Sequence, residues 1–226
     1  MPRIVAHRGA PRELRENTLP SIARALELGA AGVELDVHCS SDGVVVVHHD
    51  AELMVGDRRV PIAGTGWKEL EQAALSVGFS MPRLEEVLIL VDGRVTVHVE
   101  VKASGIEDRL LAVLSGWPDT PVHSFDHRII QTIRLREPSR PVGVLLSSYL
   151  VDTVGAVRAA DANTLWMHWS MIDRELVDDA HSRDIEIVAW TVNDTEVALM
   201  LARYGVDALC TDDCPSIATA VAKRST

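Results

Sequence analysis

The order of apolar segments along the chain predicts one α/β domain in which strand–helix units close into a (β/α)8 barrel. Short runs rich in Val and Ile alternate with helical patterns from the first residues to the last. These runs show little polar–apolar alternation, as expected of parallel strands that are covered on both faces. Eight such units in 226 residues favour a closed barrel over an open doubly wound sheet.

Strand-like and helix-like segments can be assigned in order. The strand candidates are Ile4–His7, Gly32–Val37, Val44–His48, Val95–Val101, Pro121–Ser124, Val142–Leu146, Thr164–Met167, Ile185–Trp190 and Ala208–Cys210. The helix candidates are Leu19–Leu28, Leu84–Val91, Ile106–Ser115, Arg128–Arg136, Leu150–Ala160, Arg174–Ser182, Thr195–Tyr204 and Ile217–Lys223. We expect Asp173, Asp194 and Ser216 to be helix N-caps. Gly205 is expected to end a helix.

The segment Ala51–Met81 interrupts the alternation of strands and helices. It has no strong periodicity, and it contains four residues typical of turns, Gly56, Pro61, Gly64 and Gly66. We expect this segment to be a small insertion on the barrel rim, within a single domain that spans residues 1–226.

Composition and charge limit the functions that the chain can have. Hydrophobic residues make up 47% of the chain and the mean hydropathy is +0.10, which indicates a folded protein with a sizeable core. The net charge of −11 and the pI of about 5.2 argue against binding to nucleic acid or to an anionic membrane surface. An anionic small-molecule substrate would need local positive charge from a metal ion or from Arg, Lys and His side chains.

Cysteine usage and the lack of targeting patterns favour the cytoplasm. Cys39, Cys210 and Cys214 provide no disulfide framework, and the C-x3-C spacing of the last two lacks the second pair of a typical zinc site. An apolar strand begins directly after MPR, and no apolar run approaches the ~18–20 residues of a membrane span. We therefore expect a cytoplasmic protein without a stable membrane anchor, and the oligomeric state is left open.

Two predicted strands place charged side chains on one face. Because side chains alternate along a strand, Glu34 and Asp36 share a face, and so do His98, Glu100 and Lys102. Buried carboxylates cost free energy unless they are neutralised, and oxygen ligands suit hard cations. We therefore expect Glu34, Asp36 and Glu100 to bind a divalent cation, which would be Mg²⁺ or Ca²⁺, or else Mn²⁺.

Each of these assignments has a structural alternative. Glu34 and Asp36 could instead lie at a solvated edge or pair with arginines. Lys102 is placed either to contact a phosphate as a point charge or to form an ion pair with a carboxylate. His98 lies deeper in its strand, so we expect it to be a core histidine rather than a ligand.

Two further strands end in histidines. In a barrel the carboxyl ends of the strands face the active-site mouth, so His7 is placed for proton transfer and Arg8 for a bidentate phosphate contact. The run Val44–Val47 leads into His48 and His49. Adjacent side chains point in opposite directions, so only one of these two histidines should face the site.

In combination these motifs resemble the glycerophosphodiester phosphodiesterases, and the resemblance covers nearly the whole chain in the family's order. The motifs stand here as His7-Arg8-Gly9, Glu16-Asn17-Thr18, the E-x-D pair Glu34 and Asp36, the run from Asp42-Gly43 through His49-Asp50, the E-x-K pair Glu100 and Lys102, Ser124-Phe125-Asp126, Trp190-Thr191-Val192-Asn193, Gly205-Val206-Asp207 and Thr211-Asp212. Each motif is short, but the ordered set is specific.

The resemblance implies a TIM barrel with a small insertion after the His49-Asp50 motif, where residues 51–81 lie. It implies metal-dependent hydrolysis of glycerophosphodiesters to glycerol 3-phosphate and an alcohol. The implied roles are general acid and base for His7 and His49, metal ligands for Glu34, Asp36 and Glu100, phosphate contacts for Arg8 and Lys102, and support of the first-strand loop for Glu16 and Asn17.

The part of the substrate beyond the phosphate is less well defined. Leu53–Asp57 replaces the family's usual L-x-R-T-T, and Leu14-Arg15 replaces its usual Ala-Pro before E-N-T. Related barrels cleave the head groups of lysophospholipids or sphingomyelin and form cyclic phosphates, so a reaction of the lysophospholipase D or sphingomyelinase D type is the main alternative. A barrel that only binds phosphate is a weaker one, because both histidines are present.

Three tryptophans lie at strand ends. Trp190 lies near the predicted mouth and is either an aromatic wall against the glycerol or alcohol part of the substrate or a plain core residue. Trp166 and Trp169 have the same two interpretations, and they could line an apolar pocket for a lipid-like group.

Overall fold

The computed structural model describes residues 1–223, and within them eight parallel strands form a closed ring. Going round the ring, β1 is followed by β11, β10, β9, β8, β7, β6 and β2, and β2 pairs with β1 again. The predicted (β/α)8 TIM barrel is confirmed. Residues 224–226 of the predicted domain lie outside the described residues. The strands of the ring are β1 (Arg3–His7), β2 (Gly32–Cys39), β6 (Thr96–Val101), β7 (Val122–Ser124), β8 (Val142–Leu146), β9 (Thr164–His168), β10 (Glu186–Trp190) and β11 (Ala208–Thr211).

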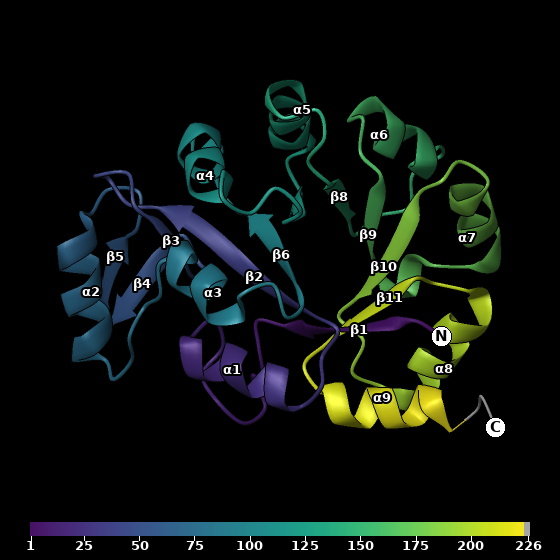
Figure 1. Ribbon diagram of the computed structural model, residues 1–226, viewed down its shortest axis with the longest axis horizontal. Coiled ribbons are helices and arrows are strands. Elements are labelled where there is room, and N and C mark those ends of the chain that lie inside the picture. The colour runs from purple at the N-terminus through teal and green to yellow at the C-terminus, as the bar shows by residue number, and fades with distance from the viewer. Residues whose placement is uncertain (224–226) are drawn as a thin grey trace.

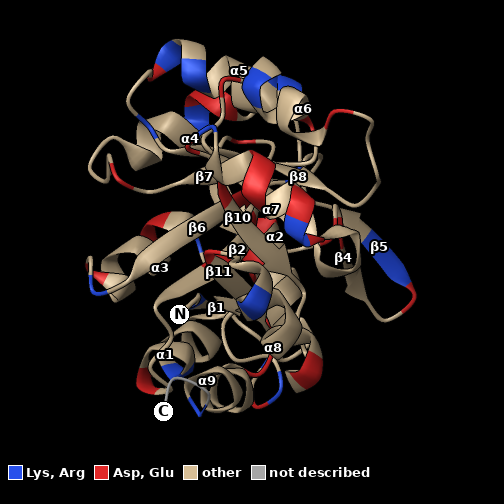
Figure 2. Ribbon diagram, turned by 90° about the vertical axis from the view of Figure 1, so that its right-hand side faces the viewer, with Lys and Arg blue, Asp and Glu red and all other residues tan. Residues whose placement is uncertain are grey.

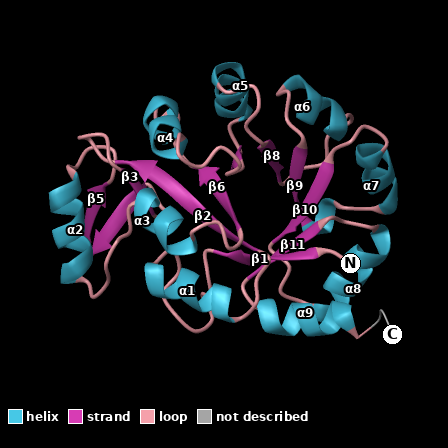
Figure 3. Ribbon diagram, viewed as in Figure 1, coloured by secondary structure: helices cyan, strands magenta, loops and turns pink. Residues whose placement is uncertain are grey.

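Helices surround the ring on its outer side, as Figure 1 shows, and Figure 3 separates the inner layer of strands from the outer layer of helices. Their buried faces pack on the Val, Ile and Leu side chains that point outward from the strands. In Figure 2 acidic and basic residues are interspersed over the outer elements. The helices that follow strands of the ring are α1 (Leu19–Glu27), α3 (Leu84–Val91), α4 (Glu107–Leu114), α5 (His127–Arg136), α6 (Thr153–Ala159), α7 (Arg174–His181), α8 (Thr195–Tyr204) and α9 (Cys214–Ala222).

The helix ends agree with most of the predicted caps. The side chains of Asp173 and Asp194 accept backbone hydrogen bonds at the starts of α7 and α8, and Gly205 ends α8 with φ +97°. The prediction for Ser216 was wrong. The backbone N–H of Ser216 donates to Asp213 at 3.2 Å, so Asp213 is the N-cap and α9 begins three residues before the predicted start.

The predicted strand over Val44–His48 exists but lies outside the ring. The strand β3 (Val45–Val47) pairs with β2 in the antiparallel direction, with Val47 opposite Val37. A run of valines is compatible with either direction, so the sequence pattern alone does not show that the chain turns back here.

Residues 51–81 form a compact unit beside β3. They contain the hairpin of β4 (Glu52–Val55) and β5 (Arg58–Pro61) and the helix α2 (Trp67–Ser76), which the sequence pattern did not reveal. Val46 of β3 packs with this unit in a cluster of its own, whereas Val45 and Val47 belong to the main core. β3 therefore joins the unit to the barrel.

The interior of the barrel is apolar below its mouth. Val5, Leu145, Trp166 and Val188 form a cluster inside the ring, to which Trp190 packs. His98 lies in this layer with its ring edge against Trp166, and burial lowers its pKa to about 3. The prediction of a core histidine at this position is confirmed. Within residues 1–223, no helix has the length and apolar character needed to cross a bilayer.

Candidate active site

A cavity of about 120 Å³ opens at the carboxyl ends of the barrel strands. A larger hollow of about 550 Å³ lies at the amino ends, beside Val95 and Thr96. Because the chemistry of such barrels is located at the carboxyl ends, the smaller cavity is the candidate site. Its lining contains most of the predicted site residues: His7, Arg8, Glu34, His49, Glu100, Lys102, His123, Phe125, Leu145, Trp166, Trp190, Thr191 and Cys210.

The chain turns sharply as it leaves β1. Arg8 and Gly9 both have positive φ, 57° and 93°. A Cβ atom on Gly9 would lie 2.5 Å from Ser21 Oγ and 2.7 Å from the Ser21 backbone carbon, so a side chain does not fit there. The turn sends the Arg8 side chain over the end of β2, where its Nε lies 3.0 Å from Asp36 Oδ2.

Glu16 and Asn17 support this turn from the loop that precedes α1. Glu16 accepts a hydrogen bond from Arg8 Nη1 at 3.0 Å. The buried Asn17 side chain donates from Nδ2 to Asp36 Oδ2 at 2.8 Å. Their contacts are therefore with Arg8 and Asp36, and they hold the loop next to His7 without contacting His7 itself.

His7 is oriented by a carboxylate at the end of β11. Its Nδ1 lies 2.7 Å from Asp212 Oδ1, and Asn193 Nδ2 donates to the other oxygen of Asp212 at 2.6 Å. Burial alone would raise the pKa of Asp212, but the hydrogen bond and charge of His7 outweigh it, and the pKa lies below its usual value. His7 Nε2 lies on the cavity side, 4.0 Å from Glu34 Oε2.

The three predicted metal ligands are buried, and two of them, Glu34 and Glu100, line the cavity, whereas Asp36 does not. Glu34 and Asp36 are 3% and 0% exposed, which rules out the solvated-edge alternative. Asp36 is paired with Arg8, and its Oδ1 lies 2.9 Å from Lys102 Nζ. Lys102 also lies 2.5 Å from Glu100 Oε1, so this lysine joins two carboxylates.

The pKa values of the three carboxyl groups follow from burial and from the neighbouring charges. Burial raises the pKa of Glu34 well above its usual value, and the charges of Asp36 and Glu100 add to this. Burial also raises the pKa of Glu100, partly offset by Lys102. Burial would raise the pKa of Asp36 too, but Lys102 and Arg8 lower it overall. Ionising Glu34 and Glu100 is therefore costly in the protein alone, and a divalent cation would offset that cost.

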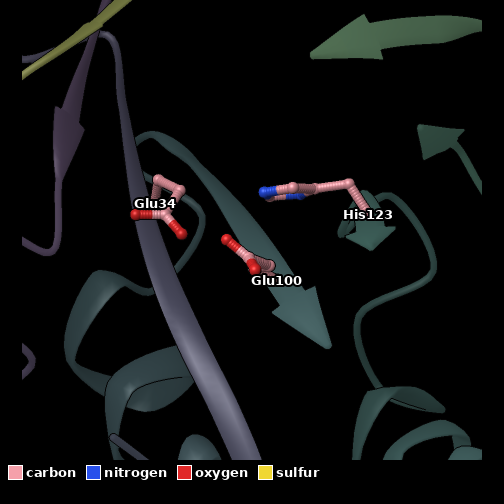
Figure 4. A group of neighbouring side chains, drawn as sticks. All are labelled: Glu34, Glu100 and His123. Carbon is pink, nitrogen blue, oxygen red and sulfur yellow. The ribbon is translucent and has the colours of Figure 1, made fainter. Parts of the chain in front are cut away.

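The imidazole of His123 lies next to two of these carboxylates. One ring nitrogen of His123 and one oxygen each of Glu34 and Glu100 lie within 4.8 Å of one another. Figure 4 shows the imidazole and the two carboxylates pointing toward the same space. Burial lowers the pKa of His123 well below its usual value, so the ring is neutral.

His48 and His49 point in different directions, as the alternation of side chains predicts. His49 lines the cavity, and its Nδ1 lies 2.8 Å from Asp50 Oδ1. His48 stacks on Phe79 in the 51–81 unit with ring centroids 6.4 Å apart. Of these two histidines, only His49 is therefore available to a ligand in the cavity.

Aromatic rings form part of the cavity wall. Trp190 meets Phe125 and His168 edge-on, with centroids 5.5 and 5.4 Å apart. Trp166 also lines the cavity, although it is only 2% exposed. Trp169 packs against the main core instead, in a short 3-10 turn after β9.

Sequence reasoning did not single out His123, Asp212 or Phe125 as site residues. For Asp212 and Phe125 the sequence did hold a signal, because the Thr211-Asp212 and Ser124-Phe125 motifs lie at predicted strand ends. His123 stands alone between Val122 and Ser124, a pattern equally typical of a buried structural histidine.

Residues 7–215 match the model of the glycerophosphoryl diester phosphodiesterase family. The chain belongs to this family. It is accordingly a phosphodiesterase, and the family resemblance stated from the motifs is confirmed.

Relatives of similar length support the family assignment. The chain is 28% identical to the glycerophosphodiester phosphodiesterase of Caldanaerobacter subterraneus subsp. tengcongensis, over 97% of this chain and 98% of the relative. It aligns with an Oleispira antarctica phosphodiesterase, solved in complex with the product sn-glycerol-3-phosphate, with a TM-score of 0.88 and 27% identity over 98% and 97% of the two chains. The Thermotoga maritima glycerophosphodiester phosphodiesterase aligns with a TM-score of 0.86 and 26% identity over 97% and 98%.

Proposed function

We propose that this phosphodiesterase hydrolyses glycerophosphodiesters to glycerol 3-phosphate and an alcohol, using a divalent cation and the His7 and His49 pair. The observation that carries the proposal is the content of one small cavity, which holds three histidines, two cationic side chains and two buried carboxylates. The product bound by the Oleispira antarctica relative supports glycerol 3-phosphate as the product here. We further propose that the enzyme works in the cytoplasm.

We propose that Glu34, Asp36 and Glu100 hold the cation, which could be Mg²⁺, Ca²⁺ or Mn²⁺. When bound, the cation would neutralise the nonbridging oxygens of the phosphodiester. Asp36 already contacts Lys102 and Arg8, so its carboxylate would be shared with these side chains. Arg8 and Lys102 line the same cavity and would bind the phosphate through their cationic groups.

The two histidines are suited to proton transfer because each is oriented through its Nδ1. Asp212 holds His7 and Asp50 holds His49, and in both rings Nε2 is left outside that contact. One ring would take a proton from the attacking water, and the other would protonate the departing alkoxide. The pair thereby supplies acid and base to a single phosphorus centre.

The aromatic wall would contact the organic part of the substrate. Trp190 and Phe125 present apolar surface beside the cationic end of the cavity. Trp190 Nε1 is buried and has no hydrogen-bond partner within the described part of the chain, so it can donate to a substrate hydroxyl.

The proposal is tested with purified protein and glycerophosphocholine. Chelation should abolish release of glycerol 3-phosphate, and adding back Mg²⁺, Ca²⁺ or Mn²⁺ should restore it. His7→Ala and His49→Ala should each lower kcat by about 10²–10⁴-fold, the usual contribution of a general acid or base. His181→Ala is the matched control, because His181 lies at the end of the outer helix α7, pairs with Asp207 and does not line the cavity. Activity that survives chelation, or near wild-type turnover in either site variant, would reject the corresponding part of the proposal.

A further inference from the structure

His123 is a buried histidine on β7 that faces the carboxylates of the cavity. It lies directly beside Glu100 of β6 in the parallel register and is 1% exposed. Its ring nitrogen and the oxygens of Glu34 and Glu100 form the group within 4.8 Å. As Figure 4 shows, the three side chains come from three neighbouring strands and converge.

Trp166 holds the His123 imidazole in place by stacking on it. The two ring centroids are 4.0 Å apart, and the angle between the planes is 2°. Trp166 is in turn contacted edge-on by His98 at 5.3 Å. A ring packed in this way keeps its orientation and cannot swing to solvent for a hydrogen-bond partner.

A polar atom of His123 lacks a protein partner. Among residues 1–223, no group accepts from or donates to its buried Nδ1. Leaving a buried polar atom unpaired costs about 1–3 kcal/mol, so folded proteins keep few of them. The buried His38, by comparison, places its Nε2 3.1 Å from the His49 carbonyl oxygen. A rigid imidazole that has an unpaired, buried Nδ1 and lies next to two carboxylates indicates a ligand-binding role rather than packing.

From this geometry we infer that His123 is a nitrogen ligand of the cation, together with Glu34 and Glu100. The inference rests on the proposed function, since it concerns the cation of the same cavity. Mg²⁺ and Ca²⁺ prefer oxygen ligands, whereas imidazole suits transition metals, and Mn²⁺ accepts both kinds. The site therefore binds Mn²⁺ in preference to Mg²⁺ and Ca²⁺.

The decisive measurement is electron spin-echo spectroscopy of the full chain loaded with Mn²⁺. A directly bound imidazole couples its nitrogen nuclei to the metal electron spin. We expect nitrogen modulation in the wild type, its loss in His123→Gln, and its retention in His98→Gln. His98 is the matched control because its ring also contacts Trp166 and it lies outside the cluster.

Calorimetric titration with the metals alone provides the second readout. His123→Gln should weaken Mn²⁺ binding by about 10-fold or more, the scale of effects seen when groups around metal sites are removed. Binding of Mg²⁺ should change by less than about 3-fold, because Mg²⁺ gains little from an imidazole. Equal losses for both metals would overturn the inferred preference.

The outcomes separate this inference from the proposed function. A wild type that binds Mn²⁺ and cleaves its substrate but shows no histidine nitrogen coupling contradicts the inference alone. A wild type that binds no divalent cation contradicts the proposed cation site as well. If His123→Gln does not fold, the same spectra of His7→Ala and His49→Ala decide the matter. Coupling that persists in both supports His123, and coupling lost in either one assigns the nitrogen elsewhere.

Discussion

Asp212 orients the imidazole ring of His7. Its Oδ1 lies 2.7 Å from His7 Nδ1, and Asn193 holds its other oxygen, so the imidazole cannot rotate freely. A carboxylate at Nδ1 selects the tautomer in which Nε2 is the proton acceptor, and it stabilises the ring when a proton arrives there. Asp212 contacts His7 and does not line the cavity, so we expect it to act through His7 and not on the substrate.

Asp212→Asn should lower kcat by about 10²–10⁴-fold with a smaller change in KM, because the amide no longer stabilises the protonated ring. Steady-state kinetics on glycerophosphocholine measures the effect. The control is Asp207→Asn, which alters the other aspartate–histidine pair, 2.9 Å from His181 and outside the cavity. Equal kcat values for the two variants would show that the His7–Asp212 contact is only structural.

The same aspartate predicts a pH effect on stability. The pKa of Asp212 is lowered in the folded protein from its ordinary value of 3.8, so its ionised form stabilises the fold. This contribution is present above pH 3.8 and is lost as the pH falls through the lowered folded value. Thermal unfolding should show wild type above Asp212→Asn at pH 6, with the gap closing in strong acid. A gap that widens on acidification would contradict this sign.

At the scale of elements, β3 links the loop that carries His49 to the 51–81 unit. Its middle residue, Val46, packs with Leu53 and Leu70 of that unit, while its neighbours pack with the barrel. His49 follows β3 after one residue, so the position of this histidine depends on how firmly the unit holds β3. The unit thereby supports the site without lining it.

Leu70→Ala should reduce the free energy of unfolding by about 2–5 kcal/mol, since Leu70 is fully buried in the small cluster. Leu75→Ala makes the same chemical change on the same helix, but Leu75 is 58% exposed, and its effect should stay within about 0.5 kcal/mol. Denaturant unfolding measures both. Similar losses for the two variants would show that the cluster does not stabilise this unit.

At the scale of the whole molecule, the candidate cavity and a buried arginine network lie at opposite ends of the barrel. Arg140, 1% exposed, precedes β8 at the amino end of the ring. It donates to Glu137 and to the carbonyl oxygens of Leu114, Trp117 and Thr120. These bonds tie the end of α4 to the start of β7, far from the cavity.

Arg140→Leu should lower the free energy of unfolding by about 3–5 kcal/mol, because it leaves buried acceptors unpaired. Its kcat/KM per folded molecule should stay within about 2-fold of wild type, as expected of the end of a barrel that serves stability. Arg136→Leu is the control, since Arg136 forms an exposed ion pair with Asp108 that is worth at most about 1 kcal/mol. A large fall in kcat/KM for Arg140→Leu would contradict the separation of the two ends.

The sequence pattern predicted the barrel and the strand-end residues of the cavity because both follow from local periodicity. Glu34 and Asp36 could be placed on one face from alternation alone, and His7 at the mouth from its strand end. The partnership of His7 with Asp212 joins residues 205 positions apart, so only closure of the ring brings them together. The direction of β3 also required the structure, because it depends on pairing with β2.

We propose that this cavity cleaves a glycerophosphodiester on the side that leaves glycerol 3-phosphate. Phosphorus NMR of glycerophosphocholine, incubated with the full chain and Mn²⁺ or Mg²⁺, tests it most directly. The substrate signal should be replaced by that of glycerol 3-phosphate, and the spectrum of the chelated sample should stay unchanged. A phosphocholine signal, or an unchanged substrate signal in the presence of either cation, would contradict it.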